Sequence, residues 1–183
     1  MRFSTSGGWM ELSTALERVK LPTIAQVQGV AAGGGCAIAL ACDLRVCTPD
    51  AKFGVPVART LGNCLSAANY TRIIDLIGPA KTKEMLFTGR LFDAVEAAQL
   101  GLVTRMAEGT SIERVVRELA ADLAANAPLT IRATKEAVRR IQERRRLEQG
   151  AIDDLIAMCY LSEDFKEGVA SFLAKRRPLF KGI

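Results

Sequence analysis

A glycine-rich segment constrains this 183-residue chain more than any other feature of its sequence. It runs Gln-Gly-Val-Ala-Ala-Gly-Gly-Gly-Cys-Ala from Gln28 to Ala37, after a short apolar run and before small apolar residues with high helix propensity. This pattern predicts a strand that passes through the glycines into a helix. Glycine has no Cβ, so a ligand can come close to the backbone there, where the first amides of the helix have no intrahelical partner.

Three interpretations of this segment are open on the glycines alone. The first is close packing of a helix on a strand, with no ligand. The second is a phosphate loop, but Cys36 and Ala37 stand where a P-loop has Lys-Ser/Thr, and no glycine lies three residues beyond Gly35 to complete a dinucleotide fingerprint. The third is an oxyanion hole, in which helix-terminal amides with partial positive charge stabilise developing negative charge.

The absence of histidine narrows the possible chemistry. With 0 His, the sequence excludes a Ser-His-Asp triad, a Cys-His pair and a histidine-rich metal site. Its 5 Cys show no Cys-x-x-Cys spacing, which favours reduced thiols in a cytoplasmic protein. We therefore expect no metal and no nucleotide cofactor, and proton transfer would use carboxylate, tyrosine, cysteine, lysine or water.

The composition, with 49% hydrophobic and 25% charged residues, predicts one globular domain of ordinary size. No apolar run is long enough to cross a bilayer, and residues 1–8 hold no apolar signal core, so we expect neither membrane insertion nor secretion. The net charge of +5 is concentrated at 139–140, 144–146 and 175–177. Solvated helix faces are the simpler interpretation of these clusters, because few aromatic residues lie among them to stack on bases.

Hydrophobic periodicity predicts strands early in the chain and helices late. We place the boundary between an α/β core, 1–110, and a helical region, 111–183. Ser66 and Asp93 are N-cap candidates, and Gly78-Pro79 separates two helices. Extended segments are expected at 23–27, 43–47, 52–57 and 102–106, and helices at 12–19, 36–42, 66–77, 80–87, 93–100, 112–126, 129–147, 151–161 and 163–175.

Several stretches, in a fixed order, form a recognisable combination. They are Leu-Pro-Thr-Ile-Ala-Gln-Val-Gln-Gly (21–29), the glycine run with Ala-Cys-Asp-Leu-Arg (41–45), Ala-Lys-Phe-Gly-Val-Pro (51–56), Leu-Phe-Thr-Gly-Arg (86–90), Ala-Ala-Gln-Leu-Gly-Leu-Val (97–103) and the tail 167–180. Together they resemble the crotonase (enoyl-CoA hydratase/isomerase) superfamily over nearly the whole chain. No single motif is decisive, but the ordered set is specific.

The resemblance implies an α/β fold, a spiral of ββα units followed by C-terminal helices that support a homotrimer or a dimer of trimers. It implies an acyl-CoA substrate that carries its own CoA, so no separate cofactor is needed. The backbone N–H of Gly34 would be one half of an oxyanion hole that polarises the thioester carbonyl and stabilises an enolate-like intermediate. Lys175 stands where family members often have a lysine near the CoA of a neighbouring subunit, and a solvated tail lysine is the alternative.

The chain departs from the family at the acid–base positions. Family hydratases have one glutamate two residues after the last glycine and another just after the proline of Phe-Gly-x-Pro, but this sequence has Ala37 and Val57 there. Neither side chain can transfer a proton. The loop that follows offers other polar groups, and we expect its Cys64 to be dispensable. The candidate substrate-binding residues are Gly33, Ala37, Pro56, Val57, Arg59, Leu61, Asn63 and Lys175.

A second departure concerns length. Family members usually carry several more strands and a helix before the residues corresponding to Leu12, and those units supply the second oxyanion amide and much of the CoA pocket. A truncated chain, a misplaced start and a genuine short form are all open. The second oxyanion amide is therefore not assigned.

Three functions follow from these observations. The first is a crotonase-type enzyme, an acyl-CoA lyase, hydratase or isomerase. The second is a non-catalytic relative that binds CoA thioesters, which Ala37 and Val57 favour. The polar residues from Arg59 to Ser66 favour the first. The third, RNA binding through the arginine-rich helix from Arg139 to Arg146, has the least support. Acyl chain length and reaction stay open.

Overall fold

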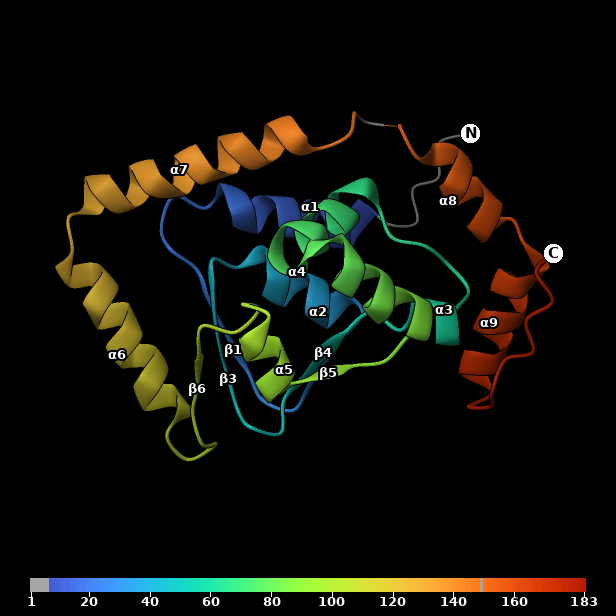
Figure 1. The fold of residues 1–183 in the computed structure, drawn as a ribbon, viewed down its shortest axis with the longest axis horizontal. Helices are drawn as coiled ribbons and strands as arrows, with labels where there is room; N and C mark the ends of the chain where they lie inside the picture. Colours follow the sequence, from blue (N-terminus) through green and yellow to red (C-terminus); the bar gives the residue numbers. More distant parts are fainter. Residues whose placement is uncertain (1–6, 149) are drawn as a thin grey trace.

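The chain folds into two small β-sheets surrounded by helices (Figure 1). The structure is a computed structural model that describes residues 7–148 and 150–183. Residues 1–6, which belong to the N-terminal segment predicted to hold no signal core, lie outside it. In chain order the elements are α1 (Gly7–Arg18), β1 (Ile24–Val27), β2 (Val30–Ala32), α2 (Gly34–Ala41), β3 (Leu44–Cys47), β4 (Lys52–Gly54), α3 (Val57–Thr60), α4 (Ala67–Thr88), β5 (Phe92–Asp93), α5 (Ala94–Gln99), β6 (Arg105–Met106), α6 (Ile112–Ala125), α7 (Pro128–Arg145), α8 (Asp153–Tyr160) and α9 (Glu163–Leu173).

The first four strands alternate between the two sheets, and β5 joins the same sheet as β4. One sheet has the order β1-β3-β6 with parallel neighbours, and the other has the order β2-β4-β5, parallel between β2 and β4 and antiparallel between β4 and β5. The chain thus adds one strand to each sheet and then a helix, α2 after the first pair and α3 with α4 after the second. This arrangement confirms the predicted α/β spiral of ββα units.

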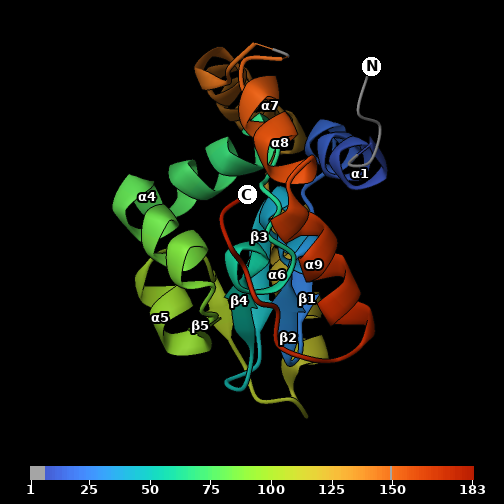
Figure 2. The same cartoon turned by 90° about the vertical axis from the view of Figure 1, so that its right-hand side faces the viewer.

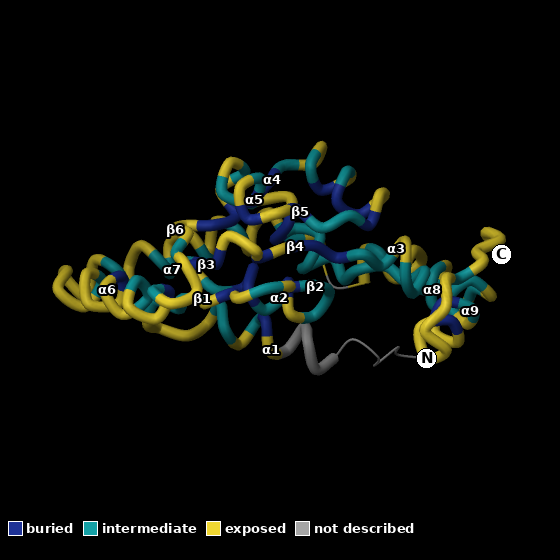
Figure 3. The backbone as a smooth tube through the Cα atoms, turned by 90° about the horizontal axis from the view of Figure 1, so that it is seen from below, coloured by how far each residue is buried: buried dark blue, intermediate teal, exposed yellow. Residues whose placement is uncertain are grey.

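The core lies between the sheets and the helices packed on them. Cys36 of α2, Phe53 of β4, Met85 of α4 and Phe92 of β5 are all fully buried. Figure 3 shows the buried residues concentrated along α2, the strands and the adjoining part of α4. Figure 2 shows α4 and α5 on one side of the strands, with α1 and α9 on the other. Burial of these side chains is the main stabilising contribution to such a core.

Local signals in the sequence correctly placed several helix ends. Ser66 accepts a hydrogen bond from the amide of Asn69 at 3.4 Å, and Asp93 accepts one from the amide of Glu96 at 2.8 Å. Both are therefore N-caps, as predicted. Gly78 has φ 71° and ψ 166°, so α4 consists of two helical parts joined at a kink, where the sequence predicted two helices.

Two short strands, the start of α2 and the end of one extended segment were predicted incorrectly. β2 lies inside the segment predicted as a glycine turn, and the two-residue β5 was not expected. Only Gly33 forms the turn, because α2 already begins at Gly34 rather than at Cys36. The extended segment predicted over 52–57 ends at Gly54, since Pro56 caps α3 and Val57 is its first residue.

The C-terminal helices surround the α/β core without forming one compact bundle. α6 packs on the first sheet through the buried Ile112 and Leu119, whereas α8 and α9 lie at the far end of the molecule from α6 (Figure 1). Large apolar side chains on α8 and α9 are exposed, among them Met158 and Phe172. In the part of the chain that the structure describes, no helix combines the length and apolar character needed to cross a membrane.

Candidate functional site

A cavity of about 540 Å³ opens at the N-terminus of α2. Residues from four parts of the chain meet there: the glycine turn with α2, the segment around α3, the start of α4, and the end of α8. The cavity is lined by Ala32, Gly33, Gly34, Gly35, Ala37, Leu40, Val55, Val57, Leu61, Asn63, Cys64, Leu65, Ser66, Asn69, Arg72, Ile73 and Tyr160.

The glycine turn is held in place by two backbone hydrogen bonds. Gly33 has φ 56° and ψ −119°, a conformation that side-chain-bearing residues rarely adopt. Its N–H donates to the carbonyl of Gly54 at 3.0 Å, and its carbonyl accepts from the amide of Ala37 at 3.0 Å. The N–H of Gly34 donates to no protein acceptor within residues 7–148 and 150–183. A first-turn amide at the cavity wall is thus left for a ligand.

The wall beyond this amide is apolar at the two acid–base positions. Ala37 and Val57 both line the cavity, together with neighbouring aliphatic side chains such as Leu61 and Ile73. Among the described residues that form this lining, none is an aspartate or glutamate. The cavity can therefore receive an apolar acyl group, and it offers no carboxylate for general acid–base catalysis.

Polar groups gather on another part of the wall. The side-chain amide of Asn63 donates to the hydroxyl oxygen of Tyr160 at 3.0 Å, and Asn63 Oδ1 is buried with no hydrogen-bond partner among the described residues. Arg72 is buried and donates to Asn69 Oδ1 at 2.7 Å and to Glu17 at 2.5 Å. Asn63 thus joins the loop after α3 to Tyr160 at the cavity wall, and its role toward a ligand stays a prediction.

Two thiols are poor nucleophiles: that of Cys36, beside the glycine turn, and that of Cys64, in the loop after α3. Burial raises the pKa of Cys36 to about 12, against the opposing effects of the Gly54 backbone and of Arg45. Burial also raises the pKa of Cys64 to about 12, and the neighbouring Cys159 adds to the rise. Because the thiolate is the reactive form, neither residue is suited to covalent catalysis near neutral pH.

Three of the predicted site residues lie apart from this cavity. Gly33, Gly34, Ala37, Val57, Leu61 and Asn63 are brought together, but Pro56, Arg59 and Lys175 are not among the described lining residues. The Pro56 carbonyl accepts the amides of Arg59 and Thr60, at 3.0 and 3.1 Å, and so shapes the loop. Arg59 and Lys175 are exposed, and a role for either in substrate binding stays a prediction.

Sequence reasoning missed Asn69, Arg72 and Tyr160 as lining residues. Asn69 and Arg72 share one face of α4, three positions apart, so the helical pattern following Ser66 could have indicated them. Tyr160 lies 97 positions from its partner Asn63, and only the tertiary fold brings them together.

Several basic side chains in and just after the arginine-rich helix α7 form ion pairs. Arg139 and Arg140 pair with Glu136 at 2.8 and 2.7 Å, and Arg146, just after the helix, pairs with Glu17 at 2.8 Å. A cation already engaged with a carboxylate must give up that contact to bind a phosphate. This pairing argues against RNA binding through α7.

Known proteins are similar to this chain both in fold and in sequence. A solved methylmalonyl-CoA decarboxylase complex superposes with a TM-score of 0.92 at 24% identity, covering 100% of this chain and 72% of that one, which shows a shared fold. A carnitinyl-CoA hydratase from Mycobacterium avium gives a TM-score of 0.75 at 29% identity, over 90% of this chain and 64% of its own. The architecture is therefore that of the crotonase-fold proteins.

Sequence similarity identifies the family. The family described as Enoyl-CoA hydratase/isomerase matches residues 3–183. A carnitinyl-CoA dehydratase of Citrobacter koseri is 38% identical over 96% of this chain and 69% of its own length. A probable mitochondrial enoyl-CoA hydratase 2 of Arabidopsis thaliana is 37% identical over 91% of this chain. This chain belongs to the enoyl-CoA hydratase/isomerase family, and it spans 56% of the length of the Arabidopsis protein.

Proposed function

We propose that this protein binds an acyl-CoA thioester in the cavity at the start of α2, with the thioester oxygen on the N–H of Gly34. The observation that carries the proposal is the unengaged Gly34 amide at the wall of a largely apolar cavity. A helix N-terminal amide carries partial positive charge. It stabilises an enolate-like oxyanion more than the neutral carbonyl, which is the requirement for catalysis.

The proposed activity is enoyl-CoA hydratase/isomerase-like chemistry without the usual pair of glutamates. Ala37 and Val57 provide no proton acceptor, so a reaction that needs a strong base is slow, and Asn63 orients the acyl group or a water. A non-catalytic CoA-thioester-binding protein is the second candidate, favoured by the same two residues. A panel of unsaturated and hydroxyacyl-CoAs, followed by mass spectrometry, separates the two candidates.

Binding itself is tested at Gly34. We expect Gly34→Val to abolish butanoyl-CoA binding in isothermal titration calorimetry, because a side chain there displaces the thioester from the amide. Thermal unfolding reports whether the variant is folded. The control is Gly109→Ala, outside the cavity lining, where an added Cβ would come no closer than 4.0 Å to Thr48. Unchanged butanoyl-CoA binding by folded Gly34→Val would overturn the proposal.

The exposed apolar face of α8 and α9 supports a homotrimer, or a dimer of trimers. Met158, Leu161 and Phe172 are 66%, 62% and 66% exposed. Apolar surface of this extent commonly marks an interface between subunits. Light scattering at micromolar concentration is expected to return a multiple of the chain mass, and a monomer would contradict this assembly.

A further inference from the structure

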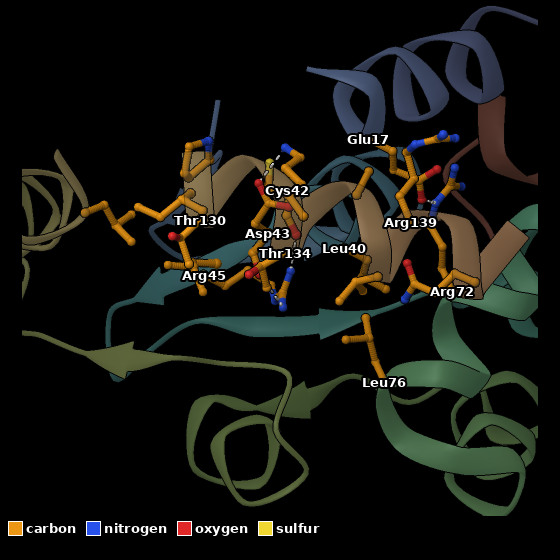
Figure 4. A pocket seen from close by; sticks show the side chains of 18 residues that line it. Glu17, Leu40, Cys42, Asp43, Arg45, Arg72, Leu76, Thr130, Thr134 and Arg139 are labelled. Carbon is orange, nitrogen blue, oxygen red and sulfur yellow. Dashed lines mark hydrogen bonds and ion pairs between the residues drawn. The ribbon is translucent and has the colours of Figure 1, made fainter. Parts of the chain in front are cut away.

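A second cavity, of about 440 Å³, lies between α7 and the face formed by α2 and the start of β3 (Figure 4). Much of its lining is aliphatic, with Leu44, Leu76, Ile131 and Val138 among its residues. Its charged groups are mostly occupied, since Lys135 pairs with Asp43 at 2.6 Å and Arg139 pairs with Glu136 at 2.8 Å. The space therefore suits a hydrocarbon chain better than an ion.

Among the residues that the structure describes, two line both this cavity and the candidate site. They are Leu40 and Arg72, which are 6% and 5% exposed. Figure 4 shows them beside α7, with Leu76 nearby. Leu40 lies three positions after Ala37 on α2, so both residues face the same side of the helix. An acyl chain that begins at Gly34 and passes Ala37 thus meets Leu40 next.

Leu40 and Arg72 together form the partition between the two cavities, and they differ in how firmly their side chains are held. Arg72 donates to Asn69 at 2.7 Å and to Glu17 at 2.5 Å, and Glu17 in turn accepts from Arg146 at 2.8 Å. These bonds fix the guanidinium in place. Leu40 is held by packing alone, so its side chain can be removed without leaving a buried charge unpaired. Leu40 is therefore the residue at which the partition can be opened.

We propose that Leu40 sets the acyl-chain length, closing the acyl end of the site and keeping the chain out of the second cavity. The native ligand is then a short-chain acyl-CoA, and the second cavity becomes a tail site only when Leu40 is made smaller. This inference rests on the proposed acyl-CoA binding.

The wild-type protein tests the length limit without any substitution. Dissociation constants are measured by calorimetry for CoA and for butanoyl-, hexanoyl-, octanoyl-, decanoyl- and dodecanoyl-CoA, each below its micelle concentration. Each methylene that enters the cavity is expected to tighten binding by about fourfold. Once the chain reaches Leu40 the gain stops, and dodecanoyl-CoA binds no tighter than a shorter member of the series.

Two variants then locate the limit. Leu40→Ala is expected to tighten dodecanoyl-CoA binding by at least about tenfold and to leave butanoyl-CoA within about threefold, because only the long chain gains contacts. Leu76→Ala is the matched control, since Leu76 lines only the second cavity. It should leave the whole series unchanged. If Leu40→Ala does not fold, the same acyl-CoA series measured with Leu40→Val and with the wild type tests the length limit instead.

The outcomes separate the two proposals. Butanoyl-CoA that binds no tighter than CoA would contradict acyl-CoA binding in the first cavity, and with it the length limit. Butanoyl-CoA that binds tighter, with affinity rising without a break to dodecanoyl-CoA in the wild type, would overturn the role of Leu40 alone. Equal effects of Leu40→Ala on short and long chains would also overturn it.

Discussion

The side-chain amide of Asn63 donates to the hydroxyl oxygen of Tyr160 at 3.0 Å, joining the loop after α3 to the end of α8 across 97 positions of sequence. The ring of Tyr160 also packs on Phe165 of α9, with centroids 4.7 Å apart. α8 thereby becomes one wall of the candidate site. A helix from the C-terminal region completes a cavity whose other walls come from the first half of the chain.

Removing the hydroxyl of Tyr160 should loosen this wall. Tyr160→Phe leaves the Asn63 amide without its partner, at a cost of about 1–3 kcal/mol. We expect faster amide hydrogen exchange in α8 and weaker butanoyl-CoA binding. Thr82→Val is the control, because its hydroxyl donates to the Gly78 carbonyl at 2.7 Å and Thr82 lies outside the cavity lining. Equal effects of the two variants on binding would contradict a specific role for the Asn63–Tyr160 bond.

Restoring the missing carboxylates should create hydratase activity. With Ala37 and Val57 in place, crotonyl-CoA hydration is expected to be far below the typical enzyme rate of about 10 per second. Ala37→Glu with Val57→Glu should raise the rate, since both side chains line the cavity. The neutral double variant with glutamine at both positions is the control and should stay inactive. Wild-type hydration at the typical rate would show that these two residues do not disable the chemistry.

The buried cluster around Glu17 predicts sensitivity to acid. Burial raises the pKa of Glu17, but the hydrogen bonds and charges of Arg72 and Arg146 outweigh it, so the pKa lies below the ordinary value of 4.5. A lowered carboxyl pKa contributes stability above 4.5, and this contribution is lost as pH falls toward the folded-state value. The protein should therefore become easier to unfold in urea over that range.

The variant Glu17→Gln isolates this effect. At pH 7 it should lower the free energy of unfolding by about 3 kcal/mol, because the buried guanidinium of Arg72 and the half-buried one of Arg146 lose their counter-charge. The difference from wild type should shrink as pH falls below 4.5, because the carboxyl is then protonated in the unfolded chain while the folded protein still holds it ionised. A difference that stays constant with pH would show that Glu17 acts by packing rather than by charge.

The sequence predicted those parts of the fold and site that depend on local interactions. Ser66 and Asp93 cap helices because each side chain reaches an amide three residues on, and Gly78 breaks α4 because its φ is 71°. The glycine segment could likewise be placed between a strand and a helix, although α2 begins at Gly34 rather than at the predicted Cys36. β2 and β5 were missed because strands of three and two residues exist only through pairing with β4.

The remaining parts of the site depend on tertiary contacts that carry no local signal. Arg59 was predicted to bind substrate; it is exposed on α3 and is not among the described lining residues, so that role stays a prediction. Tyr160 and the partition at Leu40 arise from packing between distant elements. In the sequence alone, Leu40 is one of several small or apolar residues of α2, and nothing sets it apart.

The most direct test of the account is the thioester carbonyl itself. An isotope-edited infrared difference spectrum of butanoyl-CoA, labelled with carbon-13 at that carbonyl, reports its polarisation when bound. If the N–H of Gly34 donates to the thioester oxygen, the carbonyl stretch moves to lower frequency on binding to the wild-type protein. A bound ligand whose carbonyl frequency equals that in water or lies above it would contradict the assignment of Gly34 as an oxyanion-hole donor.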